Sequence, residues 1–468
     1  MLKRSIVGLL VISMMAFGAI NVFADHFDPA VTVNDQVSTD GTVTIAQVNS
    51  AAEGFLVIHA DNDGSFGAVI GYAPVYPGAN YNVVVDIDTS AATSTLYAML
   101  HQDTGEIGVY EFGTVEGADG PVAVDGAVVT PSFTAEIVTA SDQMVDMNTV
   151  TIDSVTLSVD GFVVVHAGDA ESFGAVLGFA AVPAGTSTNV VVELEGDMTD
   201  VVWPMLHVDT GEAGVYEFGT VEGADGPVVV NGSVATMPIW TVPHMRVADQ
   251  IVVHSDGMDM MDMVPSVTAS SVLSEGAGWL VIHADNDGAP GPVLGQTLVE
   301  AGLNTDVVVE LEGDITPVLF PMLHVDTGEA GVYEFGTVEG ADGPVFVNEQ
   351  VVVFPINAAP SIYYNGSIDG NVLSIDGALA DATGWLVIHA DNAGAPGAVL
   401  GQVQVYPGLN QNLVITLEGD VTETVFPMLH FDTGEAGQYE FGTVDGADAP
   451  VFVGGNVVVG PLTPSMME

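Results

Sequence analysis

One segment of the chain occurs four times at a nearly constant spacing. Residues 207–228 read HVDTGEAGVYEFGTVEGADGPV, and residues 324–345 repeat this without a change. Residues 101–122 differ from it at two positions and residues 430–451 at four. An internal repeat of this kind outranks local patterns when a fold is predicted, because each copy marks one structural unit. The chain is therefore predicted to be an array of one module in four copies.

The histidines mark the same repeat and set the expected boundaries. Eight of the 11 histidines fall into pairs whose members lie 41 or 42 residues apart. The third module carries extra length around residues 255–263. We expect the following division: signal peptide 1–24, then modules at 25–134, 135–244, 245–357 and 358–468.

Each module reads as a series of short strands. In the second module, β-branched runs such as FVVVHA and NVVVELEG alternate with turn-forming stretches such as PAGTST and DTGEAG. This pattern is typical of antiparallel sandwiches. We predict an all-β fold of four tandem immunoglobulin-like antiparallel β-sandwich modules after a signal peptide. Pro204, Pro321 and Pro427 precede the second histidine of their pairs, and because proline cannot donate to a strand ladder, that strand is expected to be an edge or to begin there.

The N-terminus and the charge indicate export. Lys3 and Arg4 precede an apolar stretch at 6–17 and a small-residue cleavage pattern ending at Ala24, which is typical of a secretory signal. No second long apolar run follows, so no transmembrane anchor is expected in the mature chain. After residue 24, Arg246 is the one Lys or Arg against 62 acidic residues, which excludes nucleic acid as a partner. The chain has no cysteine, and therefore no disulfide or thiolate site.

His-x-Asp pairs are the strongest candidates for a ligand site. Residues two apart on a strand share a face, so each histidine and the aspartate after it would point the same way. Two such pairs per module suit zinc, copper(II) or nickel, because imidazole and carboxylate are intermediate-to-hard ligands. The alternative is that each aspartate orients a histidine or caps a turn without metal. The candidate ligands are His59, Asp61, His101, Asp103, His166, His207, Asp209, His283, Asp285, His324, Asp326, His389, Asp391, His430 and Asp432.

Three weaker patterns were weighed beside these pairs. The DNDG stretches at 61–64 and 285–288 resemble part of a calcium loop, but a plain turn explains them as well. The methionine cluster at 258–263 suits copper(I) but is more typical of a surface loop. Carboxylates are too abundant for any pair of them to indicate catalysis, so we predict that the protein is not an enzyme.

The order of several motifs resembles a known family. The motifs are ASDQ or VADQ at 140–143 and 247–250, VTIDSVTL, GFVVVHA, PAG with VVVEL, and PMLHVDTGEAGVYEF. Together they are similar to the 7282-type domain of unknown function, which recurs in tandem in surface proteins of haloarchaea and some bacteria. The resemblance covers all four modules and implies an exported β-sandwich with an acidic surface. The fourth module reads SIYYNGSIDG in place of an Asp-Gln start, which leaves its first strand open.

The favoured function is that of an exported, highly acidic structural or adhesive protein of a cell surface or extracellular matrix. Self-association or other surface proteins are the expected partners, with cations as a further possibility. The alternative is a divalent-metal-binding array that uses the histidine pairs. A carbohydrate-binding array is a third reading, with sparse aromatic candidates in Trp203, Trp240, Trp279 and Trp385.

Overall fold

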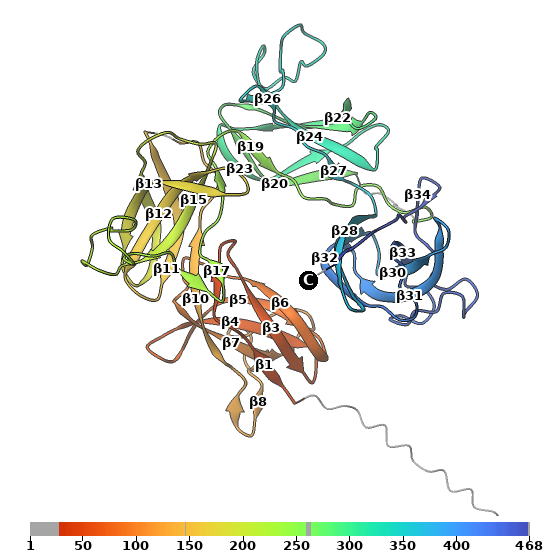
Figure 1. The fold of residues 1–468 in the computed structure, drawn as a ribbon, viewed down its shortest axis with the longest axis horizontal. Coiled ribbons are helices and arrows are strands. Elements are labelled where there is room, and N and C mark those ends of the chain that lie inside the picture. Colours follow the sequence, from red (N-terminus) through yellow and green to blue (C-terminus); the bar gives the residue numbers. More distant parts are fainter. Residues whose placement is uncertain (1–27, 146, 259–263, 467–468) are drawn as a thin grey trace, which may run out of the picture.

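The computed structural model describes residues 28–145, 147–258 and 264–466. Within these ranges every regular element is a β-strand, and the strands form four successive modules (Figure 1). The predicted signal peptide at 1–24 lies outside the described residues, as do Met260, Met261 and Met263 of the methionine cluster. No helix in the described ranges is long and apolar enough to cross a membrane.

The first module is a sandwich of two antiparallel sheets. One sheet has the order β1-β3-β6, and the other has the order β10-β7-β4-β5. The short strand β2 lies beside β10 in parallel. The bounds are β1 Ala30–Thr32, β2 Gln36–Ser38, β3 Thr42–Ser50, β4 Gly54–Asp61, β5 Phe66–Val75, β6 Gly78–Asp86, β7 Thr95–Gln102, a hairpin of β8 Ala123–Val124 and β9 Ala127–Val128, and β10 Ser132–Thr139.

The other three modules repeat this arrangement. The second uses β10 with β11 Thr149–Leu157, β12 Gly161–Gly168, β13 Phe173–Val182, β14 Gly185–Glu193, β15 Val201–Val208, β16 Val229–Val230, β17 Ser233–Val234 and β18 Ile239–Trp240. The third uses β19 His244–Arg246, β20 Ser266–Ser274, β21 Gly278–Asp285, β22 Pro290–Val299, β23 Gly302–Glu310, β24 Val318–Val325, β25 Phe346–Val347, β26 Gln350–Val351 and β27 Ile356–Asn357. The fourth uses β28 Ser361–Asp369, β29 Val372–Ala380, β30 Gly384–Asp391, β31 Pro396–Val405, β32 Gly408–Thr416, β33 Val425–Phe431, β34 Phe452–Val453, β35 Asn456–Val457 and β36 Ser465–Met466.

These sheets confirm the predicted class, an all-β chain of tandem immunoglobulin-like sandwiches. Strand order decides this. In the first three modules, leaving aside the short β2 and the two-stranded hairpins, strands one, two and five share one sheet, and strands three, four, six and seven share the other. In the fourth module the two sheets are β32-β29-β28-β36 and β31-β30-β33, because β36 pairs with β28. That division is the Greek-key connectivity of the sandwich class. The first strand of the fourth module, β28, is present and pairs with β29, so the module closes without an Asp-Gln start.

Each module has its own core, built by alternation along the strands. In the first module, Leu56 and Ile58 of β4 and Leu100 of β7 point between the two sheets and are fully buried. The residues between them point to the outer face of the same sheet, yet β4 is buried along nearly its whole length. A half-buried strand would show alternating exposure. Burial on both faces therefore means that another segment covers the outer face.

The expectation for the proline-containing strand is wrong in two modules. β15 and β24, which carry Pro204 and Pro321, lie between two neighbours in their sheets. Pairing on the outer side of β15 covers only Val201 and Val202 as a ladder, so the neighbouring strand stops short of the proline. A missing amide donor costs nothing where no partner carbonyl faces it. Proline here marks a gap in one flanking ladder rather than a sheet edge.

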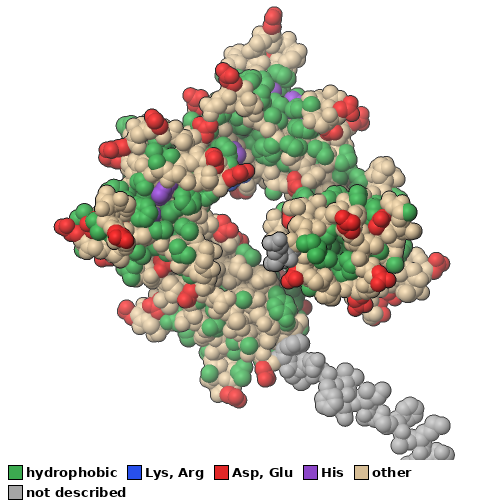
Figure 2. All heavy atoms as spheres, in the orientation of Figure 1, with side chains coloured by type: hydrophobic (Ala, Val, Ile, Leu, Met, Phe, Trp, Pro, Cys, Tyr) green, Lys and Arg blue, Asp and Glu red, His purple; other side chains and the backbone are tan. Residues whose placement is uncertain are grey.

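The modules follow a curved path. The chain bends into an open ring with the first and fourth modules on either side of the gap (Figure 1). The space-filling view shows open space in the middle and acidic side chains spread over the visible surface of every module (Figure 2). β10 is shared, since its first part pairs with β7 and its last part with β11. A continuous strand therefore joins the first two modules.

Candidate functional site

The histidine pairs lie on the outer face of the larger sheet. In the first module, β4 and β7 pair so that His59 faces Tyr97, Val57 faces Met99, and Phe55 faces His101. Because alternate residues share a face, these six side chains lie together, opposite the sandwich core. The same register recurs between β12 and β15, β21 and β24, and β30 and β33.

The repeated segment covers this face as a loop. We call it the cap loop; it comprises residues 103–120, 209–226, 326–343 and 432–449 in the four modules. In the first module its Tyr110 ring packs edge-on against Phe55 at 5.2 Å, and its Phe112 ring packs edge-on against His101 at 4.8 Å. Under the loop His101 is 0% exposed and His59 is 5% exposed. The most repeated part of the sequence thus builds a small second core.

A buried aspartate organises each cap loop, and the sequence analysis missed it. Asp119 is 0% exposed, and its carboxylate accepts the backbone N–H groups of Thr104 (2.8 Å) and Glu111 (2.5 Å). The N–H of Asp119 in turn donates to the hydroxyl oxygen of Thr104 at 2.8 Å. Its backbone is left-handed, with a φ of 47°. The equivalent residues are Asp225, Asp342 and Asp448, all fully buried. The sequence feature that could have pointed to this aspartate is the Gly-Ala-Asp motif, which recurs in every copy of the repeat.

The two rings of each pair lie close together and are held in one orientation. Every Nδ1 lies against a backbone carbonyl oxygen, at 2.8–3.1 Å for the first histidine and 2.6–2.7 Å for the second. A carbonyl only accepts, so Nδ1 carries the proton and Nε2 carries the lone pair. Ring centroids within a pair are 5.7–5.9 Å apart.

Burial keeps the second ring of each pair neutral. Desolvation lowers the pKa of His101 and His207, and it lowers the pKa of His324 and His430 to about 4. The backbone carbonyl beside each ring opposes the shift but is the smaller effect. At neutral pH the second histidine of each pair therefore presents an unprotonated Nε2 atom beneath the cap loop.

The aspartates that follow the histidines are used in turns. Asp61 accepts the N–H of Gly64 at 3.0 Å and the hydroxyl of Tyr97 at 3.0 Å, and Asp103 accepts the N–H of Gly108 at 2.7 Å. In the later modules Asp209, Asp285, Asp326, Asp391 and Asp432 each accept a glycine N–H in the same way. Among the described residues, no group of three or more His, Asp or Glu side chains is placed to hold a metal ion. Of the predicted ligands, the structure brings together the two histidines only.

The Asp-Gln motifs fasten the start of a module to its end. Gln143 exchanges two hydrogen bonds with the backbone of Thr151, at 2.7 and 2.8 Å, so its side chain acts as a piece of strand. Asp142 accepts the N–H of Trp240 at 2.9 Å, at the end of the same module. Gln36 and Gln250 make the matching bonds in the first and third modules, and Asp35 and Asp249 accept the N–H of Thr134 and of Asn357.

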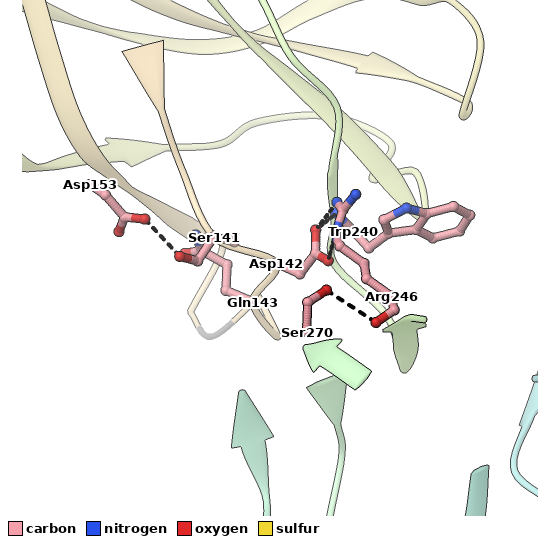
Figure 3. Close-up of polar contacts among 7 residues, drawn as sticks. All are labelled: Ser141, Asp142, Gln143, Asp153, Trp240, Arg246 and Ser270. Atoms are coloured by element: carbon pink, nitrogen blue, oxygen red, sulfur yellow. Dashed lines mark hydrogen bonds and ion pairs between the residues drawn. The ribbon is translucent and has the colours of Figure 1, made fainter. Parts of the chain in front are cut away.

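The same aspartates reach the next module. Asp142 forms a two-pronged ion pair with Arg246, with both N–O distances 2.7 Å (Figure 3). Asp249 accepts the hydroxyl of Tyr363. Arg246 and Tyr363 stand at the same place in the first strands of modules three and four, opposite Ser271 and Gly377. One motif therefore both closes a module and joins it to its neighbour.

Each later hairpin makes a second joint with the preceding module. Asn231, beside β16 and β17, donates to the carbonyl of Asp35 at 2.6 Å, and Asn348 donates to the Asp200 carboxylate. Next to β34, Gly454 and Gly455 donate to Asp256 at 3.0 and 2.7 Å. Asp256 lies in the extra length of the third module, so part of that insertion holds the fourth. Each joint between neighbouring modules therefore has two separate sets of contacts.

The joint between the second and third modules is expected to weaken in mild acid. His244 stacks on Trp240 with centroids 4.0 Å apart, and burial lowers the pKa of His244 to about 4, with Arg246 adding to the shift and Asp142 opposing it. The pKa of a histidine in the unfolded chain is near 6.5, so between pH 6.5 and pH 4 the unfolded chain binds more protons than the folded one. The stability of the folded state therefore decreases as the pH is lowered. We expect the free energy of unfolding of this unit to fall by about 1–2 kcal/mol more in the wild type than in a His244→Phe variant between pH 7 and pH 5. Urea unfolding in EDTA at constant ionic strength measures the difference, and equal pH slopes would contradict it.

Comparisons with known proteins find similarity to a curated sequence and to several solved structures. A stretch of 168 residues is 33% identical to "Cell surface glycoprotein 2" of Haloarcula hispanica, covering 35% of this chain and 16% of that protein's length. Among solved structures, the complex of Dpr2 Ig1-Ig2 with DIP-Theta aligns over 71% of this chain and 97% of its own at 8% identity, with a TM-score of 0.16. A tetra-tandem repeat from the extending region of a large adhesion protein aligns over 93% and 99% at 12% identity, with a TM-score of 0.15. With TM-scores this low, the fold assignment rests on the strand order itself.

A family model matches residues 29–136, 135–239, 257–358 and 362–463, which together make up most of the chain. Each match contains one histidine pair and one cap loop. The chain belongs to the family described as "Domain of unknown function (DUF7282)", which it carries in four tandem copies.

Proposed function

We propose that this protein is an exported structural or adhesive component of a cell surface or extracellular matrix, and that it has no catalytic role. The observation that carries the proposal is the pair of contacts at each joint, which turns four sandwiches into one curved array. The cell-surface relative from Haloarcula hispanica supports the location. The match covers only 16% of that relative, so it supports a location for this chain and no particular mode of assembly.

Fixed joints suit a load-bearing or spacing role. A flexible linker lets modules move independently, whereas an interface with buried polar contacts transmits force and orientation. The carboxylate side chain of Asp142 is only 2% exposed within its ion pair with Arg246. Such a pair has to be satisfied in full, because a buried charge without its partner is costly. The joint therefore favours one angle between its modules.

The surface charge suits a saline exterior. One basic residue stands against 62 acidic ones beyond the predicted signal peptide, so the array repels itself at low ionic strength and ions relieve that repulsion. The same charge keeps neighbouring copies apart unless a specific contact forms. Exposed edge strands, such as β5 and β13, offer backbone groups for pairing between copies or with other surface proteins.

Antibody labelling of intact, unpermeabilised cells that make the protein tests the proposal. We expect labelling of the outer surface, and mass spectrometry of the extracted protein is expected to find an N-terminus after Ala24. A cytoplasmic protein of the same cell serves as the control for leakage. Labelling that requires permeabilisation, on a protein that keeps residues 1–24, would contradict an exported role.

A further inference from the structure

The histidine pairs leave polar atoms unsatisfied in a place where water cannot reach them. Seven of the eight paired histidines have a buried Nε2 with no hydrogen-bond partner among the described residues. The eighth, His324, has its Nε2 3.2 Å from the Sδ of Met322. A buried polar atom without a partner costs about 1–3 kcal/mol. The chain bears this cost twice in nearly every module, which calls for an explanation beyond packing.

The two rings of a pair converge on a methionine. His59 and His101 lie on paired strands but are four residues out of register, because His59 faces Tyr97 and His101 faces Phe55. An offset of that length separates backbone positions by about 13 Å. The ring centroids are nevertheless only 5.9 Å apart, so the side chains lean toward each other over the middle pair of the register, which contains Met99. The equivalent methionines are Met205, Met322 and Met428, and all four are buried.

The donor atoms of this site are soft and neutral. Each module supplies two imidazole Nε2 atoms, left free by the bonds that Nδ1 makes to backbone carbonyls, and one thioether sulfur. The carboxylates that hard divalent ions prefer are held in turns, as Asp61 and Asp103 are. Thioether sulfur selects copper(I) among the biological metals, and imidazole also suits copper. We propose that each module binds one copper(I) ion between the Nε2 atoms of its two histidines and the sulfur of the methionine two residues before the second.

The surroundings fit a small cation. The Nδ1–H of His101 donates to the carbonyl of Asp119 at 2.7 Å, which fixes the ring and leaves Nε2 as the ligand atom. The buried carboxylate of the same aspartate supplies a negative charge close to the site. Its attraction acts on His101 and, through Asp225, Asp342 and Asp448, on the second histidine of every other pair. A singly charged ion would therefore be compensated without a carboxylate ligand.

One aromatic ring separates the site from solvent. Phe112 packs on His101 with centroids 4.8 Å apart and is itself 38% exposed. Residues 112–118 and Gly120 line a surface hollow beside this ring, and residues 218–224 and Gly226 line the matching hollow in the second module. Phe218, Phe335 and Phe441 hold the same position in the other modules.

Anaerobic titration of the mature chain against a coloured copper(I) chelator tests the proposal. The wild type is expected to withdraw four equivalents, one for each family repeat. His324→Gln is expected to withdraw three. His244→Gln removes a histidine that stacks on Trp240 outside the pairs, and it is expected to keep all four. The site would be overturned if the wild type withdrew no copper, or withdrew it without reaching four equivalents. Retention of all four equivalents by His324→Gln would overturn it as well.

Met322→Leu separates a ligand role from a folding role. The substitution conserves volume in a buried position and is well tolerated in cores, so this variant tests the site even if His324→Gln fails to fold. We expect one of the four equivalents to be lost at the chelator strength that the wild type overcomes. X-ray absorption of the copper-loaded wild type is expected to find two nitrogen neighbours and one sulfur neighbour. A copper environment without sulfur, or a Met322→Leu variant that binds like the wild type, would contradict the assignment, while the surface role stays unaffected by either result.

Discussion

Replacing the buried aspartate of one cap loop, Asp342→Ala, is expected to open that loop and to lower the free energy of unfolding of the third module by about 4 kcal/mol. The carboxylate of Asp342 accepts the N–H groups of Thr327 at 2.8 Å and Glu334 at 2.5 Å. Hydrogen bonds to a charged group are worth about 1.5–3 kcal/mol each. Alanine also fits poorly at the left-handed φ of 48° that aspartate adopts here.

Thermolysin cleavage within residues 326–343 and urea unfolding measure this effect together. Trypsin cannot cleave this loop, because residues 326–343 contain no Lys or Arg. Asp342→Asn keeps one acceptor oxygen and tolerates the left-handed backbone, so it is expected to cost about half as much. Glu339→Ala changes an exposed acid of the same loop and serves as the matched control. An Asp342→Ala variant as stable and as resistant as Glu339→Ala would refute the role assigned to the buried carboxylate.

Removing the only basic side chain beyond residue 24, in Arg246→Ala, is expected to release the joint between the second and third modules. Asp142 would keep its bond from the Trp240 N–H but lose both bonds from the guanidinium. A buried charge that loses its partner is destabilising, although the Arg246 side chain is 44% exposed and water screens part of the loss. We expect a cost of about 2 kcal/mol to the joint, with little change inside either module.

Calorimetry and small-angle X-ray scattering separate these two effects. The scattering curve of Arg246→Ala is expected to require a mixture of angles between the modules, while the unfolding of the individual modules stays near that of the wild type. Ser141→Ala removes an exposed hydrogen bond to Asp153 within the second module and is the control (Figure 3). Scattering from Arg246→Ala that matches both the control and the wild type would show that the ion pair does not set the angle.

The modules and their class follow from the sequence because both depend on periodic features. Repeats fix the number of units, and short β-branched runs such as FVVVHA between turn-forming stretches indicate strands. The histidines were identified for the same reason, since they stand at one position of every repeat. Their partners were not, because the choice between carboxylate ligands and turn formation at Asp61 and Asp103 depends on the loop conformation that follows each strand.

The position of the cap loop over the sheet could not be predicted from local sequence patterns. Residues 103–120 read as a polar, glycine-rich turn, and nothing local indicates that this segment folds back over a sheet. Asp119 was one acid among 62, and its burial depends on a contact across 15 residues with Thr104. The contacts that hold the joints were missed for a similar reason: Asp142 and Arg246 are separated by 104 residues. Contacts at such range depend on the packing of whole modules rather than on any one segment.

Small-angle X-ray scattering of the wild-type mature chain at high salt tests most directly whether the four modules act as one surface array. The account predicts a curve that fits the single curved arrangement of Figure 1, with the same maximum dimension at every salt concentration that keeps the chain folded. High salt matters because it screens repulsion among the acidic side chains, so the joints alone then hold the shape. A curve that requires a broad ensemble of extended and compact arrangements would contradict the account, since flexibly linked modules cannot act as a fixed spacer.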